Sequence, residues 1–210
     1  GGGICNMYGA MMKDHNWHRG GYGTLDVPHV LMVSSNVGVS KLIDKYYHNQ
    51  PDKFVEGLRR VGIGTPLGLP FDGAANPNIR MPHKDSKGGY RMSDNWSATA
   101  LAWMSIGYET QIPPISTVSF YNAIANNGKM VRPRFVKGIS KDGEMVQEFH
   151  VEVIKQRICK QSTLEDIQRI LYRVVNDPEG LGKKAGNPYF YVSGKTGTAQ
   201  VANGAGYKGG

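Results

Sequence analysis

The sequence has few cysteines and no cluster of metal ligands. Only two cysteines occur among its 210 residues, Cys5 and Cys159, and neither belongs to a C-x-x-C pair. Structural zinc sites need clustered cysteine and histidine ligands, whereas the six histidines here are scattered along the chain. We therefore expect no metal and no organic cofactor. A disulfide between the two cysteines stays open, and two unpaired buried thiols are the favoured alternative.

Long apolar runs and blocks of basic residues are also missing. No stretch approaches the roughly 18 apolar residues of a transmembrane helix, and no signal peptide is visible. The net charge of +8 would suit nucleic acid, a membrane surface or an acidic ligand. However, Lys and Arg never run longer than two residues, so we expect a basic solvated surface and no nucleic-acid partner. The glycines at both ends suggest a piece truncated at both ends, with any anchor or signal elsewhere.

Helical periodicity dominates the chain up to about residue 128, and mixed helix and strand patterns follow it. Residues 1–23 have no period and are expected to form a loop. A capping box from Ser162 to Glu165 marks the expected start of the last helix. The patterns predict helices at 25–33, 39–47, 51–61, 95–105, 113–127 and 164–175, and a hairpin at 134–140 and 145–149. The chain therefore reads as an α+β fold, with a helical lobe over about 1–128 and an α/β portion over about 129–210.

The stretch YVSGKTGTAQVA, residues 191–202, organises the functional argument. Its β-branched and aromatic residues predict a strand, and Gly194 and Gly197 would let a ligand backbone approach closely. A phosphate-binding loop would need glycine at position 189, where Tyr189 stands, and a helix after it. The alternative is K-T-G at Lys195 to Gly197, an element of serine acyl-transfer enzymes. Such a strand edge would hold an extended anionic peptide by β-augmentation.

A second polar cluster, Ser34-Ser35-Asn36, lies between two predicted helices. Taken alone, such a triplet is more often a plain helix cap. Followed by K-T-G, it matches the S-x-N element of the same enzymes. Acyl transfer needs a hydroxyl to relay protons, an amide to hold the acyl donor and a cation near the substrate carboxylate. Ser34, Asn36 and Lys195 would supply these three groups.

Three segments carry a resemblance to a known family. They are SSNVGVSKL, SIGYETQIPPISTVSFYNAIANNGKMVRP and VSGKTGTAQ. Together they resemble the transpeptidase domain of class B penicillin-binding proteins, the division or elongation D,D-transpeptidases. The resemblance runs from about residue 25 to 202 and implies the penicillin-binding transpeptidase fold, which is similar to that of serine β-lactamases. The separation of about 160 residues between Asn36 and Lys195 suits a transpeptidase with an enlarged helical lobe.

The resemblance implies a role for each matching residue. Ser34 would pass protons to the leaving amine, Asn36 would bind the donor amide, and Lys195 would hold the positive field and polarise Ser34. Thr196 and Thr198 would bind the carboxylate of D-Ala or of a β-lactam, and the Thr198 N–H would form half of the oxyanion hole. Gly197 would let the substrate lie against the strand. The implied partners are the D-Ala-D-Ala stem peptide, β-lactams and the cell-wall synthesis machinery at the periplasmic side of the inner membrane.

One part of the family pattern is missing. The nucleophile belongs to S-x-x-K, and no lysine here has a serine three residues before it. We therefore expect this polypeptide alone to form no acyl-enzyme and to represent part of a larger enzyme. The alternatives are a non-catalytic β-lactam-binding sensor and a relative of the serine β-lactamases. A K-T-G strand without neighbours would have an open edge, which predicts possible self-association.

Overall fold

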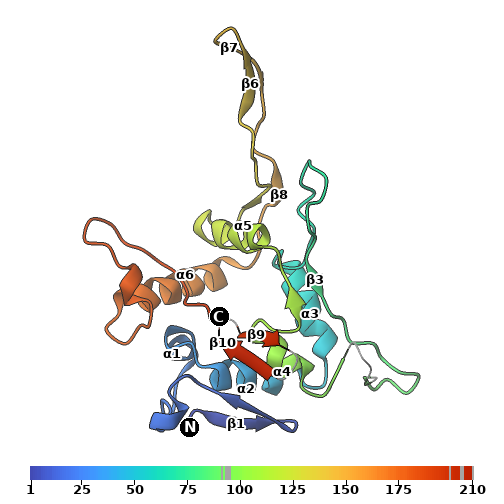
Figure 1. Ribbon diagram of the computed structural model, residues 1–210, viewed down its shortest axis with the longest axis vertical. Coiled ribbons are helices and arrows are strands. Elements are labelled where there is room, and N and C mark those ends of the chain that lie inside the picture. The colour runs from blue at the N-terminus through green and yellow to red at the C-terminus, as the bar shows by residue number, and fades with distance from the viewer. Residues whose placement is uncertain (91, 93–95, 199, 204–205, 210) are drawn as a thin grey trace. The chain divides into compact units, whose positions relative to one another are not determined.

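The computed structural model describes residues 1–90, 92, 96–198, 200–203 and 206–209. Two compact units, interleaved in sequence, share the chain. The first unit contains Gly1–Cys5, Met11–Val39 and Asp166–Gly210, and the second contains Asn6–Ala10 and Ser40–Glu165. These units are defined by which residues pack together. The boundary expected near residue 128 was based on a change in sequence pattern, and it stays a prediction. The helices in Figure 1 are α1 Val27–Met32, α2 Asn36–Tyr47, α3 Pro51–Arg60, α4 Ala100–Met104, α5 Pro114–Ala125 and α6 Gln161–Asn176, with 3-10 turns at Trp17–Arg19 and Lys183–Ala185.

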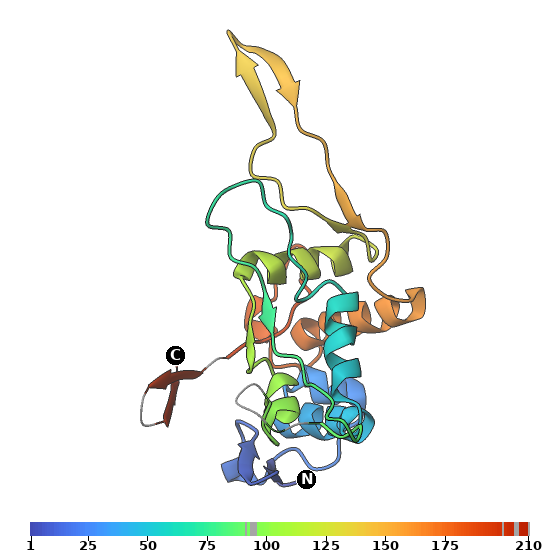
Figure 2. The ribbon, with the colours of Figure 1, turned by 90° about the vertical axis from the view of Figure 1, so that its right-hand side faces the viewer.

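Strands pair only two by two among the described residues. The pairs are β1 Ile4–Met7 with β2 Ala10–Lys13, β3 Asn78–Ile79 with β4 Thr110–Gln111, β5 Met130–Val131 with β8 Val153–Lys155, β6 Gly138–Lys141 with β7 Glu144–Glu148, and β9 Gln200–Asn203 with β10 Gly206–Gly209. The predicted hairpin is confirmed as β6 and β7 (Figure 2), because Asp142 and Gly143 both adopt the positive φ of a tight turn.

The first unit packs α1 against α6. Met32 and Val174 are fully buried, and they form a small core with Val175 and the half-buried Val192. The Asp26 side chain caps α1 by accepting the His29 N–H at 2.9 Å, and proline is tolerated in the first turn because its missing N–H would have no partner there. The predicted helix at 25–33 is thus confirmed, and it places Ser34 immediately after its C-terminal end.

The second unit has the larger core. Val55, Ile79 and Trp96 are buried together with apolar residues of α4, and one face of α3 packs on them. The Ser40 hydroxyl donates to the Ala102 carbonyl at 3.0 Å, which ties α2 to α4 inside this unit. The last helix of the predicted helical lobe, α5, ends where Gly128 takes a positive φ and donates its N–H to the Ala123 carbonyl at 2.7 Å.

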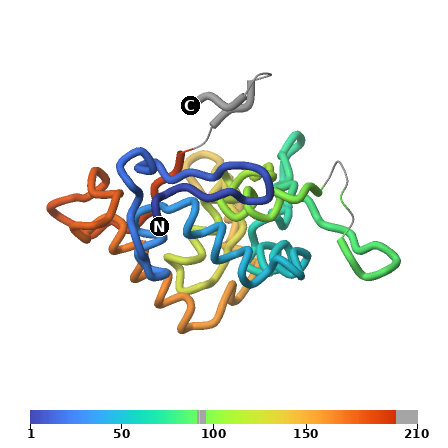
Figure 3. Tube along the Cα trace, turned by 90° about the horizontal axis from the view of Figure 1, so that it is seen from below, coloured from blue at the N-terminus to red at the C-terminus, as the bar shows by residue number. Residues whose placement is uncertain are grey.

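Three local expectations are wrong. Residues 1–23 contain the short hairpin of β1 and β2 (Figure 3), because Tyr8 and Gly9 both adopt positive φ values and form a two-residue turn. Helix α6 begins before the expected capping box, since Lys160 accepts the Leu164 N–H at 3.0 Å and Ser162 lies in the first turn. The predicted helix over 95–105 shortens to α4, and its residue 95 lies outside the described residues.

The structure also bears on membrane-spanning helices and on the cysteines. Within the described ranges, none of the helices combines the length and the apolar character needed to cross a membrane. Cys159 carries a free thiol and is half-buried, whereas a buried thiol was expected.

Candidate active site

The structure brings Ser34 and Lys195 into contact, although 161 residues separate them in the sequence. The Lys195 ammonium donates to Ser34 Oγ at 2.7 Å. It also donates to the carbonyl oxygen and to Oγ1 of Thr196, each at 3.1 Å. Burial lowers the pKa of Lys195, because desolvation disfavours the charged ammonium. The pair therefore joins a hydroxyl to a lysine that gives up its proton more readily than an exposed one.

Ser34 occupies a strained position between two helices. Its φ of 52° lies in the left-handed region, which a serine reaches at a cost of about 1–2 kcal/mol. Its N–H donates to the Leu31 carbonyl at 3.2 Å, and the next N–H, of Ser35, donates to the Val30 carbonyl at 2.9 Å. Such strain persists only where the surrounding contacts determine the backbone. The S-x-N loop is therefore a rigid connection between α1 and α2.

Asp14 holds this loop through hydrogen bonds to the residues around the start of α2. The sequence analysis did not identify this residue. Its side chain is buried, with 4% of the residue exposed, and Oδ2 accepts the Ser35 hydroxyl at 2.8 Å. Oδ1 accepts the Val37 N–H at 2.9 Å, and Ser35 Oγ accepts the Gly38 N–H at 2.9 Å. A carboxylate at a helix N-terminus satisfies N–H groups that have no partner within the helix. No local sequence signal marks this role, because Asp14 lies twenty residues before Ser34.

Asn36 is the first residue of α2 and is half-buried. Its Nδ2 donates to the Lys13 carbonyl at 3.2 Å, so the end of β2 holds both residues that follow Ser34. Two residues further on, α2 approaches α1 closely. A Cβ added to Gly38 would lie 2.8 Å from Val30 Cγ2, which leaves room for glycine alone.

The K-T-G segment does not lie in a strand. Residues 191–198 pair with no strand in the part of the chain that is described, and β9 begins only at Gln200. The prediction of a K-T-G strand is therefore wrong for these residues, and residue 199 lies outside the described ones. The physical reason is that a strand needs a partner for its backbone groups. Here the Gly194 N–H instead donates to the Leu171 carbonyl of α6 at 3.1 Å, and the Val192 carbonyl accepts Asn176 Nδ2 at 2.8 Å.

The remaining expected site residues differ in how far the structure connects them. Thr196 contacts Lys195 directly through the bonds given above, and it is half-buried. Gly197 and Thr198 are exposed, and a Cβ added to Gly197 would meet no atom within 4 Å. Neither packing nor a positive φ therefore requires glycine at this position.

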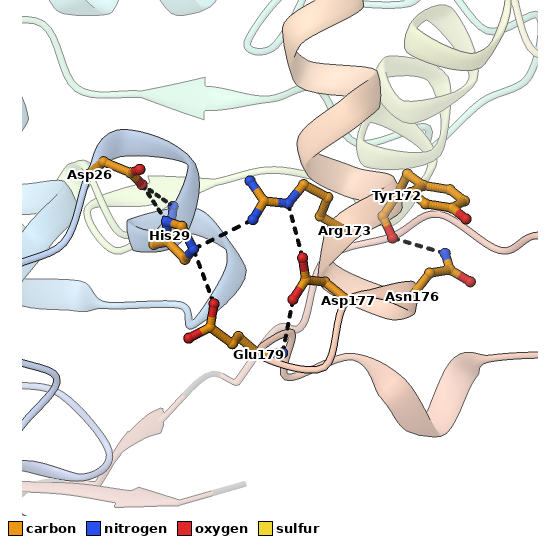
Figure 4. A network of polar contacts seen from close by, with 7 residues as sticks. All are labelled: Asp26, His29, Tyr172, Arg173, Asn176, Asp177 and Glu179. Atoms are coloured by element: carbon orange, nitrogen blue, oxygen red, sulfur yellow. Dashed lines mark hydrogen bonds and ion pairs between the residues drawn. The ribbon is translucent and has the colours of Figure 1, made fainter.

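A group of charged side chains joins α1 to the C-terminal end of α6 (Figure 4). His29 Nδ1 lies 2.6 Å from Asp26 Oδ1, and His29 Nε2 lies 3.3 Å from Glu179 Oε2. Arg173 Nε donates to Asp177 Oδ2 at 3.1 Å, while Arg173 Nη2 lies 3.4 Å from His29 Nε2. We call these five residues the α1–α6 joint. His29, the member of the joint that belongs to α1, lies five residues before Ser34 in the sequence.

The protonation equilibria of the joint follow from these contacts. The hydrogen bond with Asp26 raises the pKa of His29, and Glu179 contributes in the same direction. Hydrogen bonds from the His29 backbone and side chain lower the pKa of Asp26. The Glu179 N–H and then Arg173 lower the pKa of Asp177. Within the described ranges, no group of three or more His, Cys, Asp or Glu side chains is arranged to hold a metal ion.

Comparison with known proteins places this chain in a family. A family profile described as penicillin binding protein transpeptidase domain matches residues 4–210. Among curated relatives, a probable peptidoglycan D,D-transpeptidase PbpC of Pseudomonas aeruginosa is 33% identical over 85% of this chain and 27% of its own length. Penicillin-binding protein PbpB of Mycobacterium tuberculosis is 31% identical over 81% of this chain and 24% of its own length. The chain thus spans about a quarter of the length of these relatives.

Solved structures agree with the family profile. The transpeptidase domain of penicillin-binding protein 3 from Burkholderia pseudomallei matches with a TM-score of 0.72 and 27% identity, over 98% of this chain and 54% of that chain. Penicillin-binding protein 3 from Mycobacterium tuberculosis in complex with ampicillin matches with a TM-score of 0.72 and 28% identity, over 98% and 43%. The expected fold class is confirmed: residues 1–210 have the penicillin-binding transpeptidase fold. The chain therefore belongs to the transpeptidase-domain family of the class B penicillin-binding proteins.

Proposed function

We propose that residues 1–210 supply the S-x-N and K-T-G parts of a peptidoglycan D,D-transpeptidase centre. The observation that carries the proposal is the 2.7 Å hydrogen bond from Lys195 Nζ to Ser34 Oγ. It joins two motifs that are far apart in the chain and that acyl-transfer enzymes use together. The nucleophilic serine of S-x-x-K would come from a part of the protein outside these residues.

The geometry supports a proton relay through Ser34. In the proposed reaction, the nucleophilic serine gives its proton to the lysine of S-x-x-K, its oxygen attacks the carbonyl carbon of the penultimate D-Ala, and the bond to the terminal D-Ala breaks. Because Lys195 donates to Ser34 Oγ, the Ser34 hydroxyl proton is available to the leaving amine while a proton from Lys195 replaces it. The lowered pKa of Lys195 favours this transfer. A second stem-peptide amine then attacks the acyl-enzyme and releases the serine, which completes the cross-link.

Substrate binding would fall to the remaining motif residues. Thr196 Oγ1 accepts a hydrogen bond from Lys195, so its own hydroxyl proton is available to a D-Ala or β-lactam carboxylate. In the proposal Thr198 binds the same carboxylate and its N–H forms half of the oxyanion hole. Asn36 binds the donor amide, and the open space beside Gly197 admits the substrate backbone. We place this activity in the cell envelope, at the periplasmic side of the inner membrane, together with the cell-wall synthesis machinery.

Fluorescent penicillin tests the proposal directly. We expect the full-length protein that carries residues 1–210 to be labelled covalently on a denaturing gel, and residues 1–210 alone to stay unlabelled. Lys195→Ala should slow labelling by about 10²- to 10³-fold, as loss of one preorganised electrostatic group does in acyl transfer. The matched control is Lys41→Ala, which removes an exposed lysine of α2 and should leave the rate unchanged.

Two outcomes would point to the alternatives. A full-length protein that binds penicillin reversibly, without a covalent band, would support a non-catalytic sensor and contradict the transpeptidase proposal. Fast hydrolysis of nitrocefin would support a serine β-lactamase instead.

A further inference from the structure

The contacts of the first unit close a ring around the Ser34–Lys195 pair. Lys195 follows Gly194, whose N–H donates to the Leu171 carbonyl of α6 at 3.1 Å. Two residues along α6, Arg173 reaches His29 of α1. Five residues after His29 the chain returns to Ser34, and Ser34 accepts the bond from Lys195. The distance between the two motifs is therefore set by how α1 is joined to α6.

Two kinds of contact hold α1 against α6. One is apolar, because Met32 is fully buried against Val174 and Val175, and it is insensitive to pH. The Leu181 N–H adds a backbone bond to the Met32 carbonyl at 3.2 Å. The other kind is the α1–α6 joint, where His29 is the one member from α1 that reaches residues of α6 and of the segment that follows it (Figure 4).

We propose that His29 is a positioning residue for the acyl-transfer site. The protonation state of His29 selects its partner at the end of α6, either Glu179 or Arg173. This choice tightens or loosens the contact between α1 and α6 that places Ser34 beside Lys195. The inference rests on the proposed function, because acylation reports the position of Ser34.

The chemistry of the two ring nitrogens supports this selection. In both states Nδ1–H can donate to Asp26 Oδ1. In neutral His29, Nε2 has a lone pair and can only accept, which suits the Arg173 guanidinium. In protonated His29, Nε2–H can only donate, which suits the Glu179 carboxylate. Arg173 keeps Asp177 as its partner in either state, so Glu179 is the one carboxylate of the joint that loses its His29 contact when His29 is neutral.

The protonated state is the tighter one. It pairs the imidazolium with two carboxylates, one on each side of the joint, whereas the neutral state replaces the Glu179 contact by the 3.4 Å contact with Arg173. The hydrogen bond to Asp26 raises the pKa of His29, so this exchange falls at a higher pH than for an ordinary histidine. The joint is expected to loosen as the pH rises through that value.

The test compares acylation rates of the full-length protein with fluorescent penicillin between pH 5.5 and 9. The variant His29→Gln keeps a hydrogen-bonding side chain but cannot titrate. We expect wild type to exceed it by about tenfold at the acidic end, well within the roughly 10²-fold that a misplacement of 1 Å can cost. The ratio should approach one at the alkaline end. Glu179→Gln should show the same pH-dependent loss, and the double variant should lose no more than either single one.

The matched control is His48→Gln. His48, which directly follows α2, also pairs with an aspartate, Asp44 of α2, at 3.1 Å, but it belongs to the second unit and to none of the joint contacts. Its ratio to wild type should stay constant over the pH range. A His29→Gln ratio that is equally constant, or additive losses in the double variant, would overturn the proposal.

A separate measurement distinguishes this inference from the proposed function. If wild type is never acylated, the proposed function fails, and the joint is judged from the NMR titration of labelled histidine. Glu179→Gln should then lower the pKa of His29, because Glu179 contributes to its raised value. An unchanged His29 titration would overturn the partner selection.

Discussion

The two motifs of the site are held in different ways. The S-x-N loop is fixed by a buried carboxylate, by backbone bonds on both sides and by a close approach of α1 and α2. The K-T-G segment has no strand partner among the described residues and depends on two bonds to α6 and one apolar contact. Yet the two meet at Ser34 and Lys195. The difference is one of burial and charge: a buried carboxylate holds the S-x-N loop, whereas neutral hydrogen bonds to α6 hold the segment that carries K-T-G.

Removing the buried carboxylate of Asp14 should have the largest effect, because it loosens the more firmly held of the two motifs. Asp14→Ala leaves the Ser35 hydroxyl and the Val37 N–H buried without their acceptor, so we expect a loss of about 2–4 kcal/mol in the free energy of unfolding. Urea denaturation measures it. Asp72→Ala, at an exposed position, is the control and should change stability by less than about 0.5 kcal/mol. Equal effects of the two variants would mean that Asp14 does not hold the loop.

Crowding the α1–α2 contact tests the same loop from its other side. Gly38→Ala places a methyl group 2.8 Å from Val30 Cγ2, and overpacking of this kind costs about 1–3 kcal/mol. The companion variant Val30→Ala, combined with Gly38→Ala, should recover part of the loss, because it removes the methyl groups that clash. Thermal unfolding of the two single variants and the double variant checks this, and additive losses would contradict the packing argument.

Weakening the K-T-G attachment should have a smaller effect. Asn176→Ala removes the donor to the Val192 carbonyl, a bond at an exposed position that we expect to contribute about 0.5–1.5 kcal/mol. Hydrogen–deuterium exchange should rise in residues 190–196 and stay unchanged in residues 34–39. Asn187→Ala is the control, because its side chain bonds only locally, to the Tyr189 N–H. Faster exchange across the S-x-N loop as well would show that the two halves are not held independently.

The pH dependence of stability should give the smallest effect. The raised pKa of His29 means that folding favours its protonated form, so the stabilisation is full below the unfolded pKa of about 6.5 and is lost as the pH rises through the folded value. Asp26 and Asp177 have lowered pKa values, so their stabilisation is present above about 3.8 and is lost as the pH falls. Melting temperatures of wild type and His29→Gln should therefore converge at alkaline pH. A constant difference would exclude a titrating contribution from His29.

Local sequence patterns predicted most of the helices and one hairpin correctly. Proline at the start of α3 and α5, the apolar face of α2 and the Asp-Gly turn between β6 and β7 act through neighbouring residues, so they can be read without a structure. The short hairpin of β1 and β2 was missed because four-residue strands carry little periodicity. The start of α6 was misplaced because a serine three residues before a glutamate is not by itself a cap.

The residues of the candidate site also divide into those that local sequence patterns identified and those that only the structure revealed. The sequence by itself determined the family, through the order and spacing of S-x-N and K-T-G, and it named Ser34, Asn36, Lys195 and Thr196. Only the tertiary structure decided that Asp14 supports the loop, that the residues just before K-T-G bond to α6, and that His29 faces both Arg173 and Glu179. These features depend on contacts between segments that the chain separates by 16 to 144 residues. No local pattern encodes such a contact, because its free energy exists only once both segments are folded against each other.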